Sequence, residues 1–278
     1  MTILNAFTVD VEEWFHICEV DKEEIKFENW DKLESRVTGN TLKLMEILRE
    51  NNVKATFFFL GWIAERYPEL VLKVKKEGHE IATHGYAHKL IYKQSPEEFT
   101  KDLEKSIDVI EGIAKEKVIG YRGAGFSIKK ESLWALKIIA ERGLKYDTTI
   151  FPAKRGHGGL QTFRLYPHLI NFENDLKLWE FPISVVNILG KNIPFSGGGY
   201  LRLFPYWFIK QAIQRINRKG QAVMIYIHPR EIDVEQPRIK LPLYRKFKYY
   251  VNLKTTESKI RALLSDFKFT SIKEILSL

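Results

Sequence analysis

Residues 53–60 read Val-Lys-Ala-Thr-Phe-Phe-Phe-Leu, a run with one charged side chain in eight positions. Apolar runs of this length that are rich in aromatic and β-branched residues are typical of strands buried on both faces. A segment with helical spacing of its apolar residues precedes the run at residues 41–51, and a second such segment ends at Gly78. A buried strand between two helices indicates a parallel sheet that helices cover.

Strand-like and helix-like segments alternate along most of the remaining chain. The clearest boundary is Ser95-Pro96-Glu97-Glu98, because serine is a good N-cap and proline fits the first helical position. Further strands are expected at residues 3–9, 80–83, 118–122, 145–150, 178–186 and 222–228, and further helices at residues 96–115, 130–142, 206–219 and 255–266. This order predicts an α/β fold, and both an α/β barrel and an open doubly wound sheet fit it.

The composition is that of a globular protein. Of the 278 residues, 45% are hydrophobic and 28% are charged, which excludes a disordered or collagen-like chain. The single cysteine, Cys18, excludes an internal disulfide framework and any zinc site built from several cysteines. We expect no signal peptide and no membrane-spanning segment, and the scarcity of cysteine fits a cytoplasmic protein.

Two carboxylates end the first expected strand. Successive side chains of a strand alternate between its faces, so Asp10 and Glu12 can converge while Val11 points away. Adjacent carboxylates repel each other unless a cation or an arginine lies between them. The carboxyl ends of parallel strands are also where α/β proteins collect their chemistry.

His84 and His88 follow the third expected strand. Their i, i+4 spacing would place both imidazoles on one side of a helical turn, which is the usual way for two histidines to share a metal ion. Two histidines and one carboxylate form a facial set that leaves positions open for water and substrate. The alternative is a pair of surface or capping histidines.

Two further polar residues end apolar strands. His228 follows Met224-Ile225-Tyr226-Ile227 and is well placed to donate a proton, although it could also be a hydrogen-bonded core histidine. Arg122 could orient a carboxylate, or it could belong to an ordinary buried ion pair.

These motifs together resemble the polysaccharide deacetylase family, also called the NodB-homology family or carbohydrate esterase family 4. The resemblance covers about residues 4–230 and depends above all on Gly78-His79-Glu80-Ile81 followed by His84 and His88. The chain looks most like the subgroup associated with exopolysaccharide and exosortase loci. The segments that support this placement are Asp147-Thr148-Thr149-Ile150-Phe151-Pro152, Ser196-Gly197-Gly198-Gly199-Tyr200, His228-Pro229-Arg230-Glu231 and Tyr250-Val251-Asn252-Leu253.

The resemblance implies a distorted (β/α) barrel with a divalent metal, usually Zn²⁺, and hydrolysis of an N-acetyl group from an amino sugar. It implies that Asp10 is the general base, that Arg122 holds Asp10, and that His228 is the general acid. His84 and His88 would be metal ligands. The barrel would span residues 1–235, and residues 236–278 would form a basic C-terminal extension packed on it.

Two positions depart from the family pattern. The first motif usually has two consecutive aspartates, the second of which binds metal, but Val11 stands there in this chain. Some relatives place the metal carboxylate two residues after the first, and strand alternation also favours Glu12; the alternative has Asp10 on the metal and Glu12 as base. The proline usual after Arg122 is replaced by Gly123-Ala124-Gly125, which predicts a looser loop.

Further residues are expected around the substrate. The aromatic side chains that could stack on sugar rings are Trp14, Tyr86, Phe126, Trp179 and Tyr200. A backbone N–H beside Tyr86 could stabilise the oxyanion, and His157 could reach the substrate from a glycine-rich loop. His228 must be protonated to act as an acid, so a carboxylate should raise its pKa, and Asp147 and Glu180 are the candidates.

Two other functions remain as alternatives. One is a metal amidase that acts on a small non-sugar amide, as allantoinase-like enzymes do, and the other is a catalytically inactive carbohydrate-binding relative. We predict no nucleic-acid partner, since no helix-turn-helix pattern, zinc-finger spacing or RNP-like run occurs. Residues 238–254 contain six lysines and arginines and no acidic residue, which predicts contact with an anionic polysaccharide or with the inner membrane face.

Overall fold

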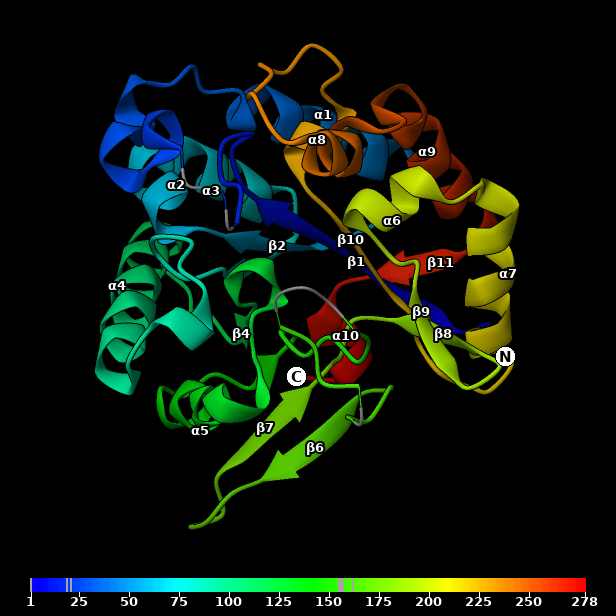
Figure 1. The fold of residues 1–278 in the computed structure, drawn as a ribbon. Coiled ribbons are helices and arrows are strands. Elements are labelled where there is room, and N and C mark those ends of the chain that lie inside the picture. Colours follow the sequence, from blue (N-terminus) through cyan, green and yellow to red (C-terminus); the bar gives the residue numbers. More distant parts are fainter. Residues whose placement is uncertain (1, 19, 21, 155–157, 162) are drawn as a thin grey trace.

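The fold is built around a curled sheet of mostly parallel strands (Figure 1). The computed structural model describes residues 2–18, 20, 22–154, 158–161 and 163–278, so His157 lies outside the described residues. The strands are β1 (Leu4–Val11), β2 (Thr56–Phe59), β3 (Glu80–Thr83), β4 (Gly120–Tyr121), β5 (Tyr146–Asp147), β6 (His168–Asn171), β7 (Lys177–Glu180), β8 (Val185–Ile188), β9 (Lys191–Pro194), β10 (Met224–Ile227) and β11 (Lys268–Thr270). The α-helices are α1 (Val37–Glu50), α2 (Gly61–Arg66), α3 (Pro68–Lys76), α4 (Pro96–Ala114), α5 (Trp134–Glu141), α6 (Gly198–Leu203), α7 (Tyr206–Asn217), α8 (Leu243–Tyr250), α9 (Thr256–Asp266) and α10 (Ile272–Leu276).

The main sheet follows the order β10-β1-β2-β3-β4-β5-β7-β6, and β11 also pairs with β1. All of these pairs are parallel except β6 with β7. Within the described residues no pairing joins β6 to β10, so the curled sheet forms an open half-barrel. The predicted α/β barrel class is confirmed by this arrangement.

The two faces of the sheet take alternate residues of each strand. In β1, Phe7, Val9 and Val11 pack in the larger apolar cluster together with residues of helices such as α1 and α3. Ala6 faces the other way, into a second apolar cluster that also contains Phe58 of β2. The alternation leaves Asp10 and Glu12 on the concave side, where both line a pocket.

The residues at and beneath this pocket come from the carboxyl ends of β1, β3, β4 and β10. Asp10 and Glu12 come from the end of β1, while His84 follows β3 and Arg122 follows β4. His228 follows β10, the neighbour of β1 on its other side. Residues far apart in sequence therefore meet because parallel strands end at the same edge of the sheet.

The C-terminal part of the chain returns to the first strand. Ala6 pairs with Met224 of β10 and with Thr270 of β11, so these two strands lie on opposite sides of β1. The strand β11 thus lies on the same side of β1 as β2. It pairs with the beginning of β1, and β2 pairs with the end. The domain boundary expected near residue 235 stays a prediction. The strand β11 lies after that position in the sequence and forms part of the main sheet.

The single strand expected at residues 178–186 is two strands. Phe181-Pro182 separates β7 from β8, since proline has no backbone N–H to donate to a neighbouring strand. β8 then pairs with β9 in a separate hairpin. No helix in the described parts of the chain has the length and apolar character needed to cross a membrane.

Candidate active site

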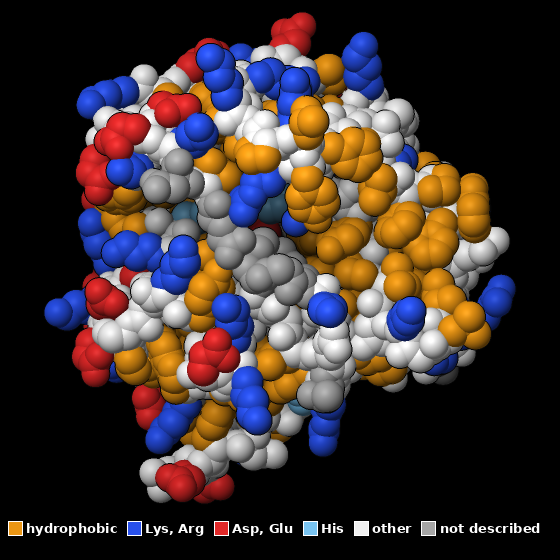
Figure 2. Space-filling view, in the orientation of Figure 1, with side chains coloured by type: hydrophobic (Ala, Val, Ile, Leu, Met, Phe, Trp, Pro, Cys, Tyr) orange, Lys and Arg blue, Asp and Glu red, His pale blue; other side chains and the backbone are white. Residues whose placement is uncertain are grey.

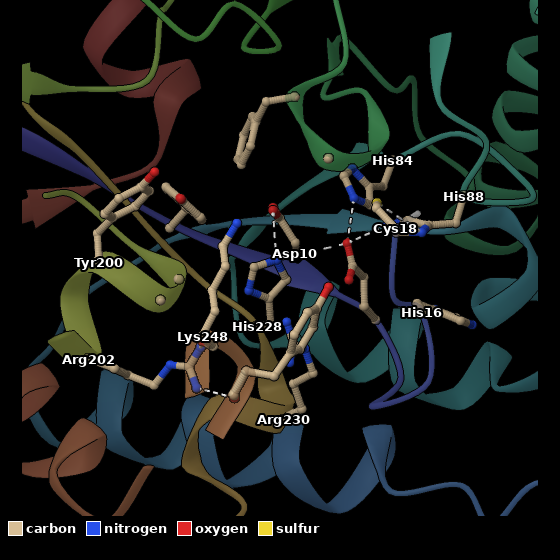
Figure 3. A pocket seen from close by; sticks show the side chains of 17 residues that line it. Asp10, His16, Cys18, His84, His88, Tyr200, Arg202, His228, Arg230 and Lys248 are labelled. Carbon is tan, nitrogen blue, oxygen red and sulfur yellow. Dashed lines mark hydrogen bonds and ion pairs between the residues drawn. The ribbon is translucent and has the colours of Figure 1, made fainter. Parts of the chain in front are cut away.

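Asp10 is held by Arg122 at the base of the pocket. Both side chains are buried, and Nη1 of Arg122 donates to Oδ1 of Asp10 at 2.5 Å. The same nitrogen donates to Oγ1 of Thr8 at 2.8 Å, and Nε of Arg122 donates to Oγ1 of Thr148 at 2.7 Å. The guanidinium also stacks over the ring of Phe58 at 4.1 Å. Asp10 is therefore fixed at one oxygen, and its Oδ2 lies towards His228 (Figure 3).

Glu12, His84 and His88 converge through one atom. Oε1 of Glu12 lies 2.7 Å from Nε2 of His84 and 3.0 Å from Nε2 of His88. Burial raises the pKa of Glu12, but the charges of His88 and His228 and the hydrogen bonds with His84 and His88 outweigh it and hold that pKa well below its usual range. The carboxylate is therefore ionised.

The geometry of His84 fits a cation at this point. Nδ1 of His84 lies 2.7 Å from the carbonyl oxygen of Arg122, which can only accept, so Nδ1 carries the proton. Nε2 of His84 faces the ionised Oε1 of Glu12, so a proton on Nε2 or a metal ion between the two atoms would hold them together. Metal-bound histidines commonly donate their second N–H to a carbonyl in this way. Among the described residues, two overlapping groups of side chains could hold a metal ion: Glu12, His84 and His88, and Asp10, Glu12 and His228.

The segment between the two histidines is a loop, not the helical turn expected from their spacing. Gly85 and His88 both have left-handed backbones, with φ of +74° and +52°. Asp102 of α4 holds the loop by accepting the N–H groups of Tyr86 and Ala87 at 2.8 and 3.2 Å. The N–H of Gly85 donates to Thr83, so all three backbone donors beside Tyr86 are taken and none is free to stabilise an oxyanion.

His228 faces both carboxylates of β1. Its Nε2 lies 3.7 Å from Oδ2 of Asp10 and 4.0 Å from Oε1 of Glu12. Its Nδ1 lies 3.6 Å from Oε2 of Glu231, which sits one turn later in the 3₁₀ helix Pro229–Ile232. Burial lowers the pKa of His228, but Glu12 and Glu231 raise it by more, so the net shift is upward.

The carboxylates expected to act on His228 are elsewhere. Asp147 and Glu180 lie opposite each other on β5 and β7, and Thr149 donates two hydrogen bonds to Asp147. Burial and the neighbouring Asp147 raise the pKa of Glu180 well above its usual range. Among the described residues, the carboxylates within 4 Å of His228 are Asp10, Glu12 and Glu231. The expectation for Asp147 and Glu180 is corrected to Glu231.

The aromatic residues expected to contact substrate divide into two groups. Phe126 and Tyr200 line the pocket. Trp14 is buried and donates to the carbonyl oxygen of Glu34, and Trp179 lies in β7 beside Tyr146; neither lines the pocket within the described residues. Tyr86 also lies outside it, because its hydroxyl donates to Glu65 and Lys105 stacks over its ring.

Several pocket residues come from the last third of the chain and were not predicted as site residues. Arg230 lies within the quoted His228–Glu231 segment, and Lys248 lies within the basic run, so both carried a sequence signal. Tyr249 follows Lys248 in α8. Arg202 of α6 also lines the pocket. Its guanidinium donates to the carbonyl oxygens of Lys248 and Tyr249, and its Nε lies 3.3 Å from Oε1 of Glu231. The helix α8 is thereby tied to the residue that faces His228.

A curled α/β half-barrel carries a carboxylate–histidine group at its strand ends. Residues 26–146 match the polysaccharide deacetylase family, and residues 148–277 match a domain of unknown function, DUF3473. The chain is thus similar to the polysaccharide deacetylase family over its first half and to DUF3473 over its second. The site draws on both regions, with His84 and Arg122 from the first and His228 from the second.

The similar proteins share the fold more than the sequence. A peptidoglycan-N-acetylglucosamine deacetylase of Bacillus cereus is 36% identical over 74 residues, which are 27% of this chain and 27% of that protein. The aligned part therefore spans about a quarter of the relative's length. The crystal structure of a putative polysaccharide deacetylase from Mycobacterium smegmatis has a TM-score of 0.65 at 21% identity and covers 99% of this chain and 89% of that one. The PuuE allantoinase structure has the same TM-score at 13% identity, with the same coverage.

Proposed function

We propose that this protein hydrolyses N-acetyl groups from an amino-sugar oligosaccharide or polysaccharide and releases acetate. The observation that carries the proposal is one pocket in which the Glu12–His84–His88 group lies beside the facing pair of Asp10 and His228. A possible metal site and a carboxylate–imidazole pair are the parts that hydrolysis of an unactivated amide needs.

Glu12, His84 and His88 would hold a divalent ion, for which zinc fits the two imidazoles and one carboxylate. When bound, that ion would polarise the amide carbonyl and make a water molecule more acidic. Glu12 suits this role better than Asp10, because its Oε1 faces both histidines whereas Oδ1 of Asp10 is engaged by Arg122.

Asp10 and His228 would move the protons. Asp10 takes a proton from the attacking water, and Arg122 orients that carboxylate by its hydrogen bond. His228 gives a proton to the departing sugar nitrogen, and Glu231 favours its protonated form from the Nδ1 side. Both groups line the pocket, and their nearest atoms lie 3.7 Å apart.

The test is acetate release from a panel of N-acetylated oligosaccharides by the zinc-loaded protein. The wild type should release acetate, His84→Ala should lose both metal and acetate release, and Asp10→Asn should keep the metal but lose turnover. A wild type that binds zinc and releases nothing from any glycan would favour the inactive carbohydrate-binding alternative. Allantoin in the same panel tests the small-amide alternative. We include it because the fold is similar to that of an allantoinase.

We further propose that the outer face of α8 contacts an anionic membrane surface. Leu243, Tyr244 and Phe247 are 85%, 77% and 56% exposed, whereas large apolar residues are otherwise mostly buried. Figure 2 shows hydrophobic side chains gathered over α6, α7 and α8 with lysines and arginines beside them. An apolar face next to basic residues is typical of helices that lie in a lipid interface. The cytoplasmic location and the exopolysaccharide role stay predictions.

Co-sedimentation with vesicles tests this contact. The wild type should pellet with vesicles that contain phosphatidylglycerol and less with purely zwitterionic vesicles. Phe247→Glu should lower the bound fraction several-fold, while Leu72→Glu, at an exposed leucine of α3, should leave it unchanged. Equal binding of all three proteins would contradict the proposal.

A further inference from the structure

Arg230 is buried, and among the described residues no carboxylate lies within ion-pair distance of it. Its side chain lines the same pocket as Asp10 and His228 and is 8% exposed. Its Nε has no hydrogen-bond partner among the described residues, and no ion pair of Arg230 with a described carboxylate lies within 4 Å. A buried guanidinium left in this state is costly unless a ligand completes it.

The other buried arginines near the pocket show the contrast. Arg122 is paired with Asp10 at 2.5 Å, and Arg202 is paired with Glu231 at 3.3 Å. Glu231 also lies 3.6 Å from Nδ1 of His228, so each of its oxygens lies within 4 Å of a basic side chain. Among the described residues, Asp10 and Glu231 thus lie beside other basic groups, and Arg230, which lines the pocket, lies within 4 Å of no carboxylate.

The surroundings of Arg230 hold it in place for a ligand. Its guanidinium stacks over the ring of Tyr249 at 4.8 Å, which fixes its plane. Lys248, the preceding residue in α8, lines the same pocket and extends into it (Figure 3). A planar guanidinium matches the two oxygens of a carboxylate or phosphate, and an ammonium nearby adds to the attraction.

We propose that Arg230, assisted by Lys248, binds a negatively charged group of the substrate, so that the substrate is an acidic N-acetylated glycan. The charged group is a carboxylate or a phosphate on, or next to, the sugar that loses its acetyl group. This inference rests on the proposed deacetylase function and specifies its substrate class.

The experiment compares substrates that differ only in charge. The first pair tests a carboxylate: it is a tetrasaccharide of alternating glucuronate and N-acetylglucosamine, compared with its carboxyl-reduced form. The second pair tests a phosphate: it is N-acetylglucosamine 1-phosphate, compared with N-acetylglucosamine. The wild type should show a kcat/KM about ten- to a hundredfold higher for the charged member of at least one pair, the usual effect of a hydrogen bond to a charged group. The arm with the larger ratio identifies the source of the charge. Equal values within both pairs would overturn the inference.

Variants assign the preference to Arg230. Arg230→Gln should bring the charged-to-neutral ratio close to one, and Arg230→Lys should keep part of it. The matched control is Arg238→Gln, because Arg238 also stacks on a tyrosine of α8, Tyr250, but is exposed and outside the pocket; its ratio should equal that of the wild type. A ratio that survives in Arg230→Gln, with thermal unfolding showing a folded protein, would contradict the role of Arg230.

Failure of the proposed function gives a different result. If the wild type releases no acetate from any member of the panel, the deacetylase proposal fails, but calorimetric binding of the charged and carboxyl-reduced tetrasaccharides to the Asp10→Asn variant still tests the subsite. Tighter binding of the charged tetrasaccharide, lost on adding Arg230→Gln, would support an anion subsite in a carbohydrate-binding protein. Equal binding of both would overturn the subsite.

Discussion

Glu12 and His84 stand 72 positions apart in the sequence, yet Oε1 of one lies 2.7 Å from Nε2 of the other. The contact exists because β1 and β3 end at the same edge of the sheet with one strand, β2, between them. It places the Glu12 carboxylate against the imidazole nitrogen that points away from the carbonyl oxygen of Arg122. A metal ion bound between these two atoms would make them a ligand pair.

Glu12→Gln should therefore weaken zinc binding by roughly a hundredfold or more, since losing even an outer-shell partner of a metal ligand typically costs ten- to a hundredfold. Asp10→Asn should change zinc affinity little. Competition with a chelator of known affinity measures both constants. The opposite pattern, with Asp10→Asn losing the metal, would exchange the roles of the two carboxylates.

Removal of Arg122 should destabilise the protein strongly, because it leaves Asp10 buried without its cation. For Arg122→Met we expect a loss of about 3–5 kcal/mol in the free energy of unfolding. The double variant Asp10→Asn with Arg122→Met should lose less than the sum of the two single variants, as groups in contact do. Urea denaturation of the four proteins gives the coupling, and strict additivity would show that the ion pair contributes nothing to it.

Glu231→Gln should move the alkaline limb of the pH–rate profile to lower pH. The Glu231 carboxylate favours the protonated form of His228, so a neutral amide lets His228 lose its proton earlier as pH rises. Fewer molecules then carry the proton that the leaving nitrogen needs. Glu180→Gln is the control and should leave the alkaline limb at the same pH. If the limb shifts in Glu180→Gln and not in Glu231→Gln, Glu180 is the carboxylate that raises the pKa of His228, as expected from the sequence.

His79 should make stability fall in mild acid. Burial, together with Lys54, lowers the pKa of His79 to about 4 in the folded protein, whereas the unfolded chain has the ordinary value of 6.5. Above pH 6.5 both states are neutral; as the pH falls from 6.5 to 4, only the unfolded state takes up a proton, and up to about 3 kcal/mol of stability is lost.

His79→Asn tests this effect without removing the local hydrogen bond. Nδ1 of His79 accepts the N–H of Ala55 at 3.1 Å, and the amide oxygen of asparagine can accept it instead without titrating. The difference in unfolding free energy between the variant and the wild type should therefore change between pH 7 and pH 4 in favour of the variant. A difference that stays constant over that range would contradict the role of His79.

Local patterns predicted the features that depend on local physics. The expected strand at residues 80–83 is β3 as observed, and the helix expected to begin after Ser95 has a capping box between Ser95 and Glu98. Strand alternation correctly grouped Asp10 with Glu12. In each case the determining interactions are between residues a few positions apart.

The features that sequence reasoning missed depend on distant partners. The turn between His84 and His88 is not helical because Asp102, on another helix, holds its backbone. Tyr86 faces Glu65 and Lys105, and no local pattern reveals that it turns away from the pocket. Glu231 is the exception, since it lies three residues after His228 and its position in a short helix could have been considered from the sequence.

The pairing of β1 on both sides also has a consequence for the order of folding. The strand β1, which carries Asp10, is synthesised before its partners at residues 224–227 and 268–270. At about 5–20 residues per second, the β1 segment waits roughly ten to fifty seconds for β11 to be made. The nascent chain must keep this apolar segment from other contacts during that time.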